Sequence, residues 1–304
     1  MFDYINKIKL NLDFYSGKDF YSDGDIEDEL LDIVKNNNTF EDILKNDKRW
    51  PVLYHLSPIR ENIIEWYPFE EASKILEIGS GCGAITGALC RNGAKVTSID
   101  LSKKRSLINA YRHNTLDNLE IIVGNFNDIK LEGEYDYITL IGVFEYARLY
   151  TNTENPYIDF LKTIKKYLKP EGKLIIAIEN KYGLKYFAGC REDHYGTFFS
   201  GIEGYVSDAT ISTFSKNELS GILEDAGFTE NKFYYPYPDY KFPKEIFSDK
   251  FLPRKGQLMW NVNNYDRDRM VLFDELPAFD SIIENKMFDF FSNSYLVFAS
   301  FQGE

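Results

Sequence analysis

Short apolar runs alternate with helical patterns through the middle of the chain. The runs predict seven strands, in chain order Lys74–Gly79, Lys95–Asp100, Leu119–Gly124, Tyr137–Val143, Lys173–Glu179, Lys232–Tyr235 and Tyr295–Phe301. Helical patterns lie between most of the first five strands, at residues 83–92, 102–113 and 156–168. Strands that alternate with helices predict a parallel sheet covered on both faces.

A helical N-terminal extension is predicted over residues 1–70, because apolar side chains recur there at helical spacing. The first helix is predicted over residues 25–35. The second, over residues 58–67, begins at a proline that suits a first turn. It places three apolar side chains on one face, Ile59, Ile63 and Trp66. The main domain is then expected over residues 71–304.

The C-terminal third contains a capped helix and a long insertion. Ser215 and Glu218 have capping-box spacing and start a helix that stops at Gly227. Residues 236–294 hold several prolines and many aromatic residues, and we interpret them as an insertion packed over the sheet. The predicted fold is α/β, with a doubly wound, mostly parallel seven-stranded sheet and this insertion before the last strand.

The net charge of the chain limits the classes of molecule that it can bind. The 304 residues contain 48 acidic and 35 basic side chains, for a net charge of −13. A protein that neutralises phosphates needs the opposite sign, so nucleic acid is an unlikely substrate. Apolar residues make up 44% and charged residues 27%, as in an ordinary soluble domain.

Cysteine usage and the N-terminus indicate a cytoplasmic protein. Neither a Cys-x-x-Cys pair nor a Cys and His spacing typical of metal sites occurs, so we expect no metal. The three cysteines are Cys82, Cys90 and Cys190, a sparse, odd count that suggests a reducing compartment. The first residues lack a signal-peptide pattern, and the longest aliphatic run, Leu174–Ile178, is too short to cross a membrane.

A glycine-rich motif follows the first strand of the main domain. Residues 76–87 read LEIGSGCGAITG, with alternate glycines at Gly79, Gly81 and Gly83. A side chain here would push a nucleoside cofactor away from the backbone. Asp100 ends the next strand, where a carboxylate can accept both ribose hydroxyls of an adenosine.

These residues alone leave two cofactors open. Gly79-x-Gly81-x-x-Ala84 with Asp100 also satisfies the dinucleotide fingerprint. Against that interpretation stand the acidic Glu77 in the strand, the third glycine, and the position of the motif behind an extension. A dinucleotide-dependent oxidoreductase remains the alternative, and NAD binding would establish it.

Several segments in the same order resemble the motifs of class I S-adenosylmethionine-dependent methyltransferases. The resemblance covers residues 72–180 and, more weakly, Phe214–Phe228. Its segments are Glu77–Gly83, Ile99–Ser102, Ile122–Phe126, Tyr135–Tyr146 and Leu168–Leu174. It implies S-adenosylmethionine as cofactor, S-adenosylhomocysteine as product, and a sheet whose last strand is reversed.

The resemblance also implies roles on the methionine side of the cofactor. The three glycines pass beneath the methionine, Glu77 fixes the nearby backbone and the amino group, and Gly142 faces that amino group. Tyr54 or Arg60, in the segment before the motif, is a candidate for the methionine carboxylate. A capped surface helix with Arg60 exposed is the alternative.

On the nucleoside side, the resemblance implies four contacts. Asp100 holds the ribose and Leu101 lies against the adenine. Asn125 and Phe126 meet the adenine edge. The family usually has Asp where this chain has Asn125, but an amide oxygen can still accept a bond from the exocyclic amine.

The acceptor loop is predicted at residues 180–213, beyond the carboxyl end of the fifth strand. Within it, His194 is a candidate general base and Arg191 a candidate clamp for a carboxylate. The alternative is a solvated turn with a structural ion pair. Residues 234–240 alternate Tyr and Pro, which indicates either a rim over the acceptor or packing of the insertion.

The prediction for the reaction is methylation of oxygen. The acceptor is a carboxylate of a peptide or natural-product precursor, or a sugar hydroxyl, because the chain looks similar to bacterial methyltransferases of surface sugars, natural products and peptides. N-methylation of a small molecule and a non-catalytic cofactor-binding partner are the alternatives.

Overall fold

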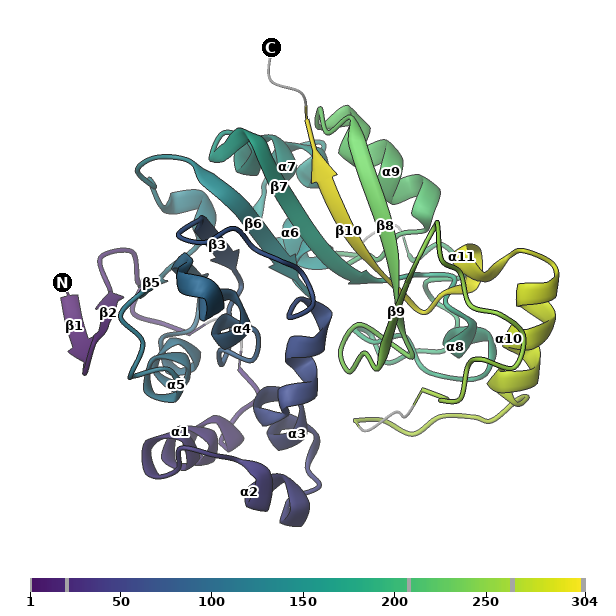
Figure 1. The fold of residues 1–304 in the computed structure, drawn as a ribbon, viewed down its shortest axis with the longest axis horizontal. Helices are drawn as coiled ribbons and strands as arrows, with labels where there is room; N and C mark the ends of the chain where they lie inside the picture. The colour runs from purple at the N-terminus through teal and green to yellow at the C-terminus, as the bar shows by residue number, and fades with distance from the viewer. Residues whose placement is uncertain (1, 20–21, 207–208, 263–265, 302–304) are drawn as a thin grey trace. The chain divides into compact units, whose positions relative to one another are not determined.

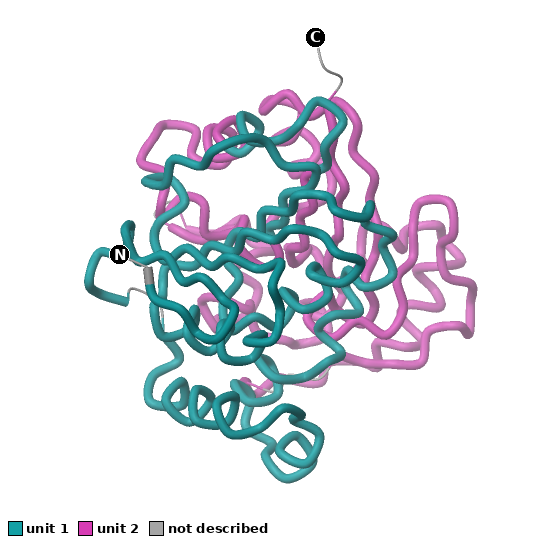
Figure 2. Tube along the Cα trace, turned by 60° about the vertical axis from the view of Figure 1, so that its left-hand side comes forward, with its two compact units in different colours: residues 1–140, 164–173 teal, residues 141–163, 174–304 magenta. Residues whose placement is uncertain are grey.

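The computed structural model describes residues 2–19, 22–206, 209–262 and 266–301. Contacts group the chain into two compact units (Figure 2). Unit 1 comprises residues 1–140 and 164–173, and unit 2 comprises residues 141–163 and 174–304. Residues 1–70 lie within unit 1, and the division into an extension and a main domain stays a prediction. The α/β class is confirmed.

Unit 1 contains a mostly parallel sheet in the order β1-β2-β5-β4-β3-β6, followed by the start of β7 (Figure 1). The β1–β2 hairpin is antiparallel, and the pairs β2–β5, β5–β4, β4–β3 and β3–β6 are parallel. The strands are β1 (Phe2–Ile5), β2 (Ile8–Asn11), β3 (Lys74–Ile78), β4 (Lys95–Asp100), β5 (Leu119–Val123), β6 (Tyr135–Ile141) and β7 (Leu168–Glu179).

The helices of unit 1 fall into two groups. The first precedes β3 and lies together in Figure 1: α1 (Ile26–Asn36), α2 (Glu41–Asn46), α3 (Trp50–Leu56) and the 3-10 helix η1 (Pro58–Ile63). The second connects the strands: α4 (Thr86–Cys90), η2 (Arg91–Gly93), α5 (Lys103–Arg112) and η3 (Phe126–Asp128).

The first 70 residues differ from the expected helices in two places. Residues 2–11 form a hairpin for which no element was predicted, and Ile8 and Leu10 in it alternate with polar residues and are fully buried. The helix expected over residues 58–67 is the shorter η1. A 3-10 helix has three residues per turn, so Ile59 and Ile63 do not share a face: Ile63 is buried and Ile59 is exposed. Trp66 lies beyond the end of η1 and is also exposed.

Unit 2 continues β7 and adds three strands in the order β7-β10-β8-β9. They are β8 (Glu230–Tyr237), β9 (Glu245–Ser248) and β10 (Ser294–Ser300). Strand β10 is antiparallel to both β7 and β8, which confirms the reversed last strand. The helices are η4 (Phe144–Tyr146), α6 (Ala147–Tyr150), α7 (Pro156–Lys165), α8 (Leu184–Phe187), α9 (Lys216–Asp225), α10 (Glu275–Glu284) and α11 (Phe288–Phe291).

The described residues contain ten strands, so the prediction of seven is wrong. The additional strands are β1, β2 and β9. Strand β7 also begins at Leu168 rather than Lys173, because its first residues continue the strand through Pro170, a residue tolerated near a strand's start. No described helix is both long and apolar enough to span a lipid bilayer.

Two local predictions in unit 2 are confirmed. Ser215 and Glu218 form the capping box at the start of α9. In the Tyr–Pro segment, Tyr235, Tyr237 and Tyr240 are buried, which supports packing of the insertion rather than an exposed rim.

A buried ion-pair network joins α1 to α5 in unit 1. Glu27 is fully buried and accepts a bond from Arg105 Nε at 2.7 Å. Arg105 Nη2 also donates to Asp23 Oδ2 at 2.8 Å, and the same oxygen lies 2.7 Å from His55 Nε2. The network fixes one helix of the N-terminal segment against a helix that follows β4.

We expect Glu27→Ala to lower the free energy of unfolding by roughly 3–5 kcal/mol, because it leaves Arg105 buried with one carboxylate fewer. Glu29→Ala, two residues along the same helix, is the matched control. Glu29 pairs with Arg49 at the surface, so its loss should change stability little. Urea unfolding of both variants measures the difference, and equal effects would contradict the assignment.

Glu77 is a buried carboxyl group between β3 and β4. Its Oε2 accepts bonds from Ser98 Oγ at 2.6 Å and Thr86 Oγ1 at 2.7 Å. Burial raises the pKa of Glu77 to about 7, and the two hydroxyl bonds only partly oppose this shift.

A raised pKa means that the folded protein binds the Glu77 proton more tightly than the unfolded chain does. The folded state is therefore destabilised as pH rises from about 4.5 to about 7, by at most about 3.5 kcal/mol at about 1.4 kcal/mol per pKa unit. Glu77→Gln removes this titration. We expect the variant's stability relative to wild type to increase between pH 5 and pH 8, measured by urea unfolding without cofactor. A constant difference would contradict the shift.

Candidate functional site

The loop after β3 passes through three glycines with left-handed backbone angles. Gly79, Gly81 and Gly83 have φ angles of 75°, 52° and 76°. A Cβ atom built at Gly81 meets no atom within 4 Å, whereas one built at Gly83 lies 2.3 Å from Asn109 Oδ1. Gly83 is therefore required for packing within unit 1, and Gly81 leaves open space beside the backbone.

The carboxylate of Asp100 fixes this loop. Its Oδ2 accepts the Gly81 N–H at 2.7 Å, and its Oδ1 accepts the Ser102 N–H at 2.8 Å. Burial raises the pKa of Asp100, although these bonds and Arg105 oppose the shift. Each carboxylate oxygen can accept a further bond. Asp100 thus joins the glycine loop, through Gly81, to Ser102 at the start of α5, and it retains capacity for two ligand hydroxyls.

The hydroxyl of Ser80 adds to this capacity. It is buried between Gly79 and Gly81 and makes no hydrogen bond to any residue that the structure describes. Open space, a buried hydroxyl and spare lone pairs at Asp100 fit a nucleoside that approaches the backbone closely.

The predicted adenine contacts lie in different environments. Leu101 and Asn125 are half-buried, and Asn125 Oδ1 accepts the Asn127 N–H at 3.1 Å. Phe126 is buried and packs edge-to-face on Tyr167, with ring centres 5.8 Å apart. Asn125 therefore caps η3, and the predicted contacts of these three residues with adenine stay predictions.

Arg60 and Tyr54 are brought together in unit 1. The Arg60 guanidinium lies 4.0 Å from the centre of the Tyr54 ring, and Arg60 is only 4% exposed. The alternative in which Arg60 is exposed is therefore wrong. Contact of either residue with a methionine carboxylate stays a prediction.

Glu77 and Gly142 have defined partners in their own units. Glu77 holds the hydroxyls of Ser98 and Thr86, as described above. Gly142, in unit 2, has a φ of 69° and donates its N–H to the carbonyl of Ala177. The predicted contacts of Glu77 and Gly142 with the methionine amino group stay predictions.

His194 lies between two carboxylates in unit 2. Its Nδ1 is 2.9 Å from Glu192 Oε1, and its Nε2 is 3.7 Å from Glu145 Oε1. Burial lowers the pKa of His194, but Glu145 and Glu192 outweigh burial and hold the pKa well above its usual range. His194 is therefore held as an imidazolium, a state that donates protons rather than accepts them.

Glu145 and Glu179 are almost completely buried. Burial raises the pKa of Glu145. Burial also favours the neutral form of Glu179, but positive charges, Lys241 foremost, hold the pKa of Glu179 below its usual range. Glu179 Oε1 accepts bonds from Lys241 Nζ and from the Tyr240 hydroxyl. One oxygen on each carboxylate, Oε2, has no hydrogen-bond partner among the described residues.

Two lysines complete this group of side chains. Lys185 Nζ is 2.6 Å from Asp239 and 3.0 Å from Asp193, and Lys241 Nζ is 2.6 Å from Asp193. We define the carboxylate cluster as the five acids with these two lysines and His194. The acids are Glu145, Glu179, Glu192, Asp193 and Asp239. The carboxylate cluster therefore contains more acidic groups than cationic groups.

Arg191 has separate partners. Its Nε and Nη2 atoms each lie 3.0 Å from a carboxylate oxygen of Asp268, and the guanidinium lies 4.1 Å from the centre of the Phe198 ring. The edge of the Arg191 guanidinium that would bind an acceptor carboxylate is thus already paired with Asp268. A clamping role requires Asp268 to be displaced, and it stays a prediction.

The sequence analysis missed Glu145, Glu179 and Lys241 as site residues. The available signal was an acidic residue at the end of an aliphatic strand: Glu179 closes β7, and Glu145 follows β6 closely. Their proximity to His194 depends on the fold and has no local sequence pattern.

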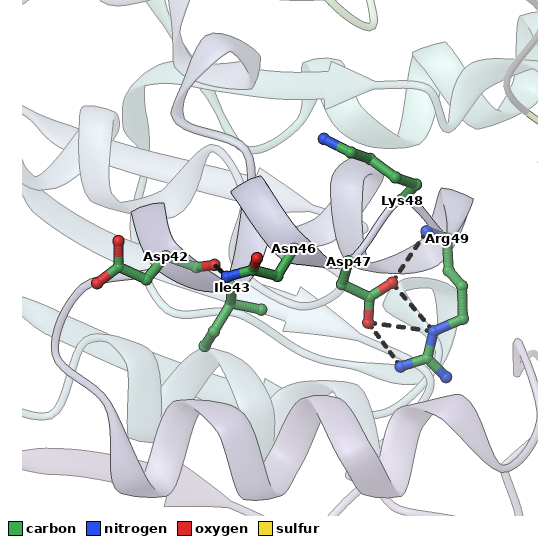
Figure 3. Close-up of a pocket in the computed structure, with 6 residues that line it drawn as sticks. All are labelled: Asp42, Ile43, Asn46, Asp47, Lys48 and Arg49. Atoms are coloured by element: carbon green, nitrogen blue, oxygen red, sulfur yellow. Dashed lines mark hydrogen bonds and ion pairs between the residues drawn. The ribbon is translucent and has the colours of Figure 1, made fainter.

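A depression on unit 1 includes none of the predicted site residues (Figure 3). Its lining residues come from α2 and the turn before α3 and are Asp42, Ile43, Asn46, Asp47, Lys48 and Arg49. Asp47 and Glu29 both bind Arg49, so the feature is a surface ion-pair network.

Parts of this chain are similar to known proteins. A family described as Methyltransferase domain matches residues 53–230, more than half of the chain. A malonyl-(acyl-carrier protein) O-methyltransferase of Priestia megaterium is 29% identical over 52% of this chain and 54% of its own length. A mitochondrial ubiquinone biosynthesis O-methyltransferase of Schizosaccharomyces pombe is 33% identical over 34% of this chain and 37% of its own length. The chain thus spans about half or less of these relatives.

The fold has a similar solved structure. The methyltransferase in a complex with the Haloferax volcanii methyltransferase activator Trm112 aligns with a TM-score of 0.50 and 16% identity. The alignment covers 93% of this chain and 99% of that chain. Together with the family match, the likeness confirms the resemblance to class I S-adenosylmethionine-dependent methyltransferases, and the chain belongs to the methyltransferase domain family.

Proposed function

We propose that the chain is an S-adenosylmethionine-dependent O-methyltransferase whose acceptor is a neutral hydroxyl group, such as that of a sugar, and that the carboxylate cluster receives this acceptor. The main support for this proposal is the excess of buried carboxyl groups in the cluster. A carboxylate acceptor would be repelled there. Arg191, which would offset that repulsion, is paired with Asp268.

Unit 1 supplies the cofactor contacts in this proposal. S-adenosylmethionine, when bound, supplies a methyl group already activated by a sulfonium. Asp100 accepts the ribose hydroxyls through its spare lone pairs, and Gly81 lets the cofactor approach the backbone. Orientation of the two reactants then contributes roughly 7–11 kcal/mol to lowering the barrier.

Unit 2 handles the proton of the acceptor. The hydroxyl oxygen attacks the methyl carbon while the carbon–sulfur bond breaks, and the sulfur keeps the bonding electrons. The hydroxyl proton passes to a carboxylate of the cluster, because His194 already holds a proton. Proton removal of this kind contributes about 10²–10⁴-fold to rate.

Methylation of an amine is the second candidate function. The excess of carboxylates that disfavours a carboxylate acceptor also attracts an ammonium group. Two relatives named as O-methyltransferases support the oxygen acceptor instead.

Methyl-labelled S-adenosylmethionine, incubated with the protein and heat-killed extract of its source cells, tests the acceptor class. We expect label that survives mild alkali and is released by hot hydriodic acid, which cleaves methyl ethers. Label released by mild alkali as methanol would indicate a methyl ester and would refute the hydroxyl acceptor. Label that resists both treatments would indicate N-methylation.

Gly81→Ala and Gly83→Ala form a matched pair for the cofactor site. Both add a methyl group at a positive φ angle, at a strain of roughly 1–2 kcal/mol. The Gly81 methyl enters open space, so we expect the fold to persist while S-adenosylhomocysteine binds at least about tenfold more weakly. The Gly83 methyl meets Asn109, so that variant should lose more stability.

Isothermal titration calorimetry and thermal unfolding give the two readouts. Unchanged affinity in Gly81→Ala would show that the open space beside the loop does not receive the cofactor.

A further inference from the structure

Three buried side chains of unit 2 converge on one point. Glu145 from η4, Glu179 from the end of β7 and His194 from the loop after α8 each present a potential ligand atom. These atoms all lie within 4.8 Å of one another. Ligands of an octahedral ion bound at about 2.1 Å are about 3 Å apart. Small side-chain movements would therefore bring all three onto one ion.

Two oxygen atoms at this point lack the partners that buried groups normally have. Glu145 is 1% exposed and Glu179 is 0% exposed, yet neither Oε2 has a hydrogen-bond partner among the described residues. A buried polar atom without a partner is costly, and a bound ion is one of the recognised explanations for such an atom. Lys241 occupies Glu179 Oε1 and leaves Oε2 available.

The orientation of His194 suits a metal ligand. Its Nδ1 lies 2.9 Å from Glu192 Oε1, and Glu192 also accepts the backbone N–H groups of His194 and Tyr195. Histidines that bind metals usually donate their second ring N–H to a carboxylate, which fixes the tautomer and the ring. Glu192 holds His194 in this way and leaves Nε2 facing Glu145.

The charge of the cluster favours a cation. The cluster contains five carboxylates and two lysines, and His194 can carry one further positive charge. That sum leaves the buried group negative by two charges. A divalent ion that replaces the His194 proton brings the sum closer to neutral.

We propose that Glu145, Glu179 and His194 bind a divalent transition-metal ion such as Mn²⁺. Two carboxylate oxygens and one imidazole nitrogen suit Mn²⁺, Fe²⁺ or Zn²⁺ better than Mg²⁺, which prefers oxygen ligands alone. Sequence spacing could not indicate this site, because the three ligands come from separate elements.

The site deepens the proposed function and rests on it for its role. Three protein ligands leave coordination positions for an acceptor oxygen. A hydroxyl bound to the ion loses its proton more readily, and a carboxylate of the cluster can take that proton. Binding of the ion itself does not depend on the reaction.

Metal-free protein, prepared by dialysis against a chelator, is titrated with Mn²⁺, and free Mn²⁺ is followed by electron paramagnetic resonance. We expect one saturable site per chain. Glu145→Gln and His194→Gln should each weaken binding at least about tenfold, and Glu192→Gln should weaken it by about 10–100-fold. Asp268→Asn, which removes an exposed carboxylate of unit 2, should leave binding unchanged.

Absence of saturable binding, or binding that neither Glu145→Gln nor His194→Gln weakens, would overturn the site. Thermal unfolding checks that each variant is folded. If both variants fail to fold, electron spin-echo spectroscopy of Mn²⁺ bound to the wild-type protein tests the site instead. Coupling of the ion to one histidine nitrogen would support the site, and absence of this coupling would overturn it.

The labelled-methyl assay separates the two proposals. Transfer to a hydroxyl that persists at full rate in excess chelator overturns the metal's role and leaves the proposed function intact. Specific Mn²⁺ binding without hydroxyl methylation supports the site and refutes the proposed function.

Discussion

The geometry of the glycine-rich loop after β3 depends on one carboxylate. Asp100 accepts a backbone N–H from the loop after β3 and another from the residue that caps α5. Because β3 and β4 are parallel neighbours, their carboxyl ends meet at one edge of the sheet, and a single short side chain reaches both loops. Asp100 thus fixes the left-handed turn at Gly81, and the space beside this turn stays open.

The two units treat buried charge differently. In unit 1, Glu27 and Arg105 satisfy each other, and the pair connects two helices. In unit 2, the Oε2 atoms of Glu145 and Glu179 have no hydrogen-bond partner among the described residues, although Glu179 directly follows the aliphatic run Leu174–Ile178 of β7. Such an arrangement costs stability, and local conflicts of this kind concentrate at functional sites. This cost in stability is consistent with the binding site that we propose at the end of β7.

Local patterns predicted the parts of the fold that depend on local physics. The glycine motif, the seven longer strands and the Ser215 capping box follow from spacing and turn chemistry. The hairpin at residues 2–11 was missed because two apolar residues in a polar segment are a weak strand signal. The partner of Arg191 is Asp268, 77 residues away, and no local pattern indicates such a pair. The proximity of Glu145 and Glu179 to His194 was missed for the same reason.

The strand pairings also define which piece of the chain can be handled alone. The segment that matches the family, residues 53–230, excludes β2, which covers the backbone edge of β5. It also excludes β10, which is inserted between β7 and β8. The same limits remove all of β8 except Glu230, so a recombinant fragment cut there would expose unpaired edges of β5 and β7, which are templates for aggregation. Expression work should therefore retain both chain ends, because recognisable homology and the minimal folding unit do not coincide.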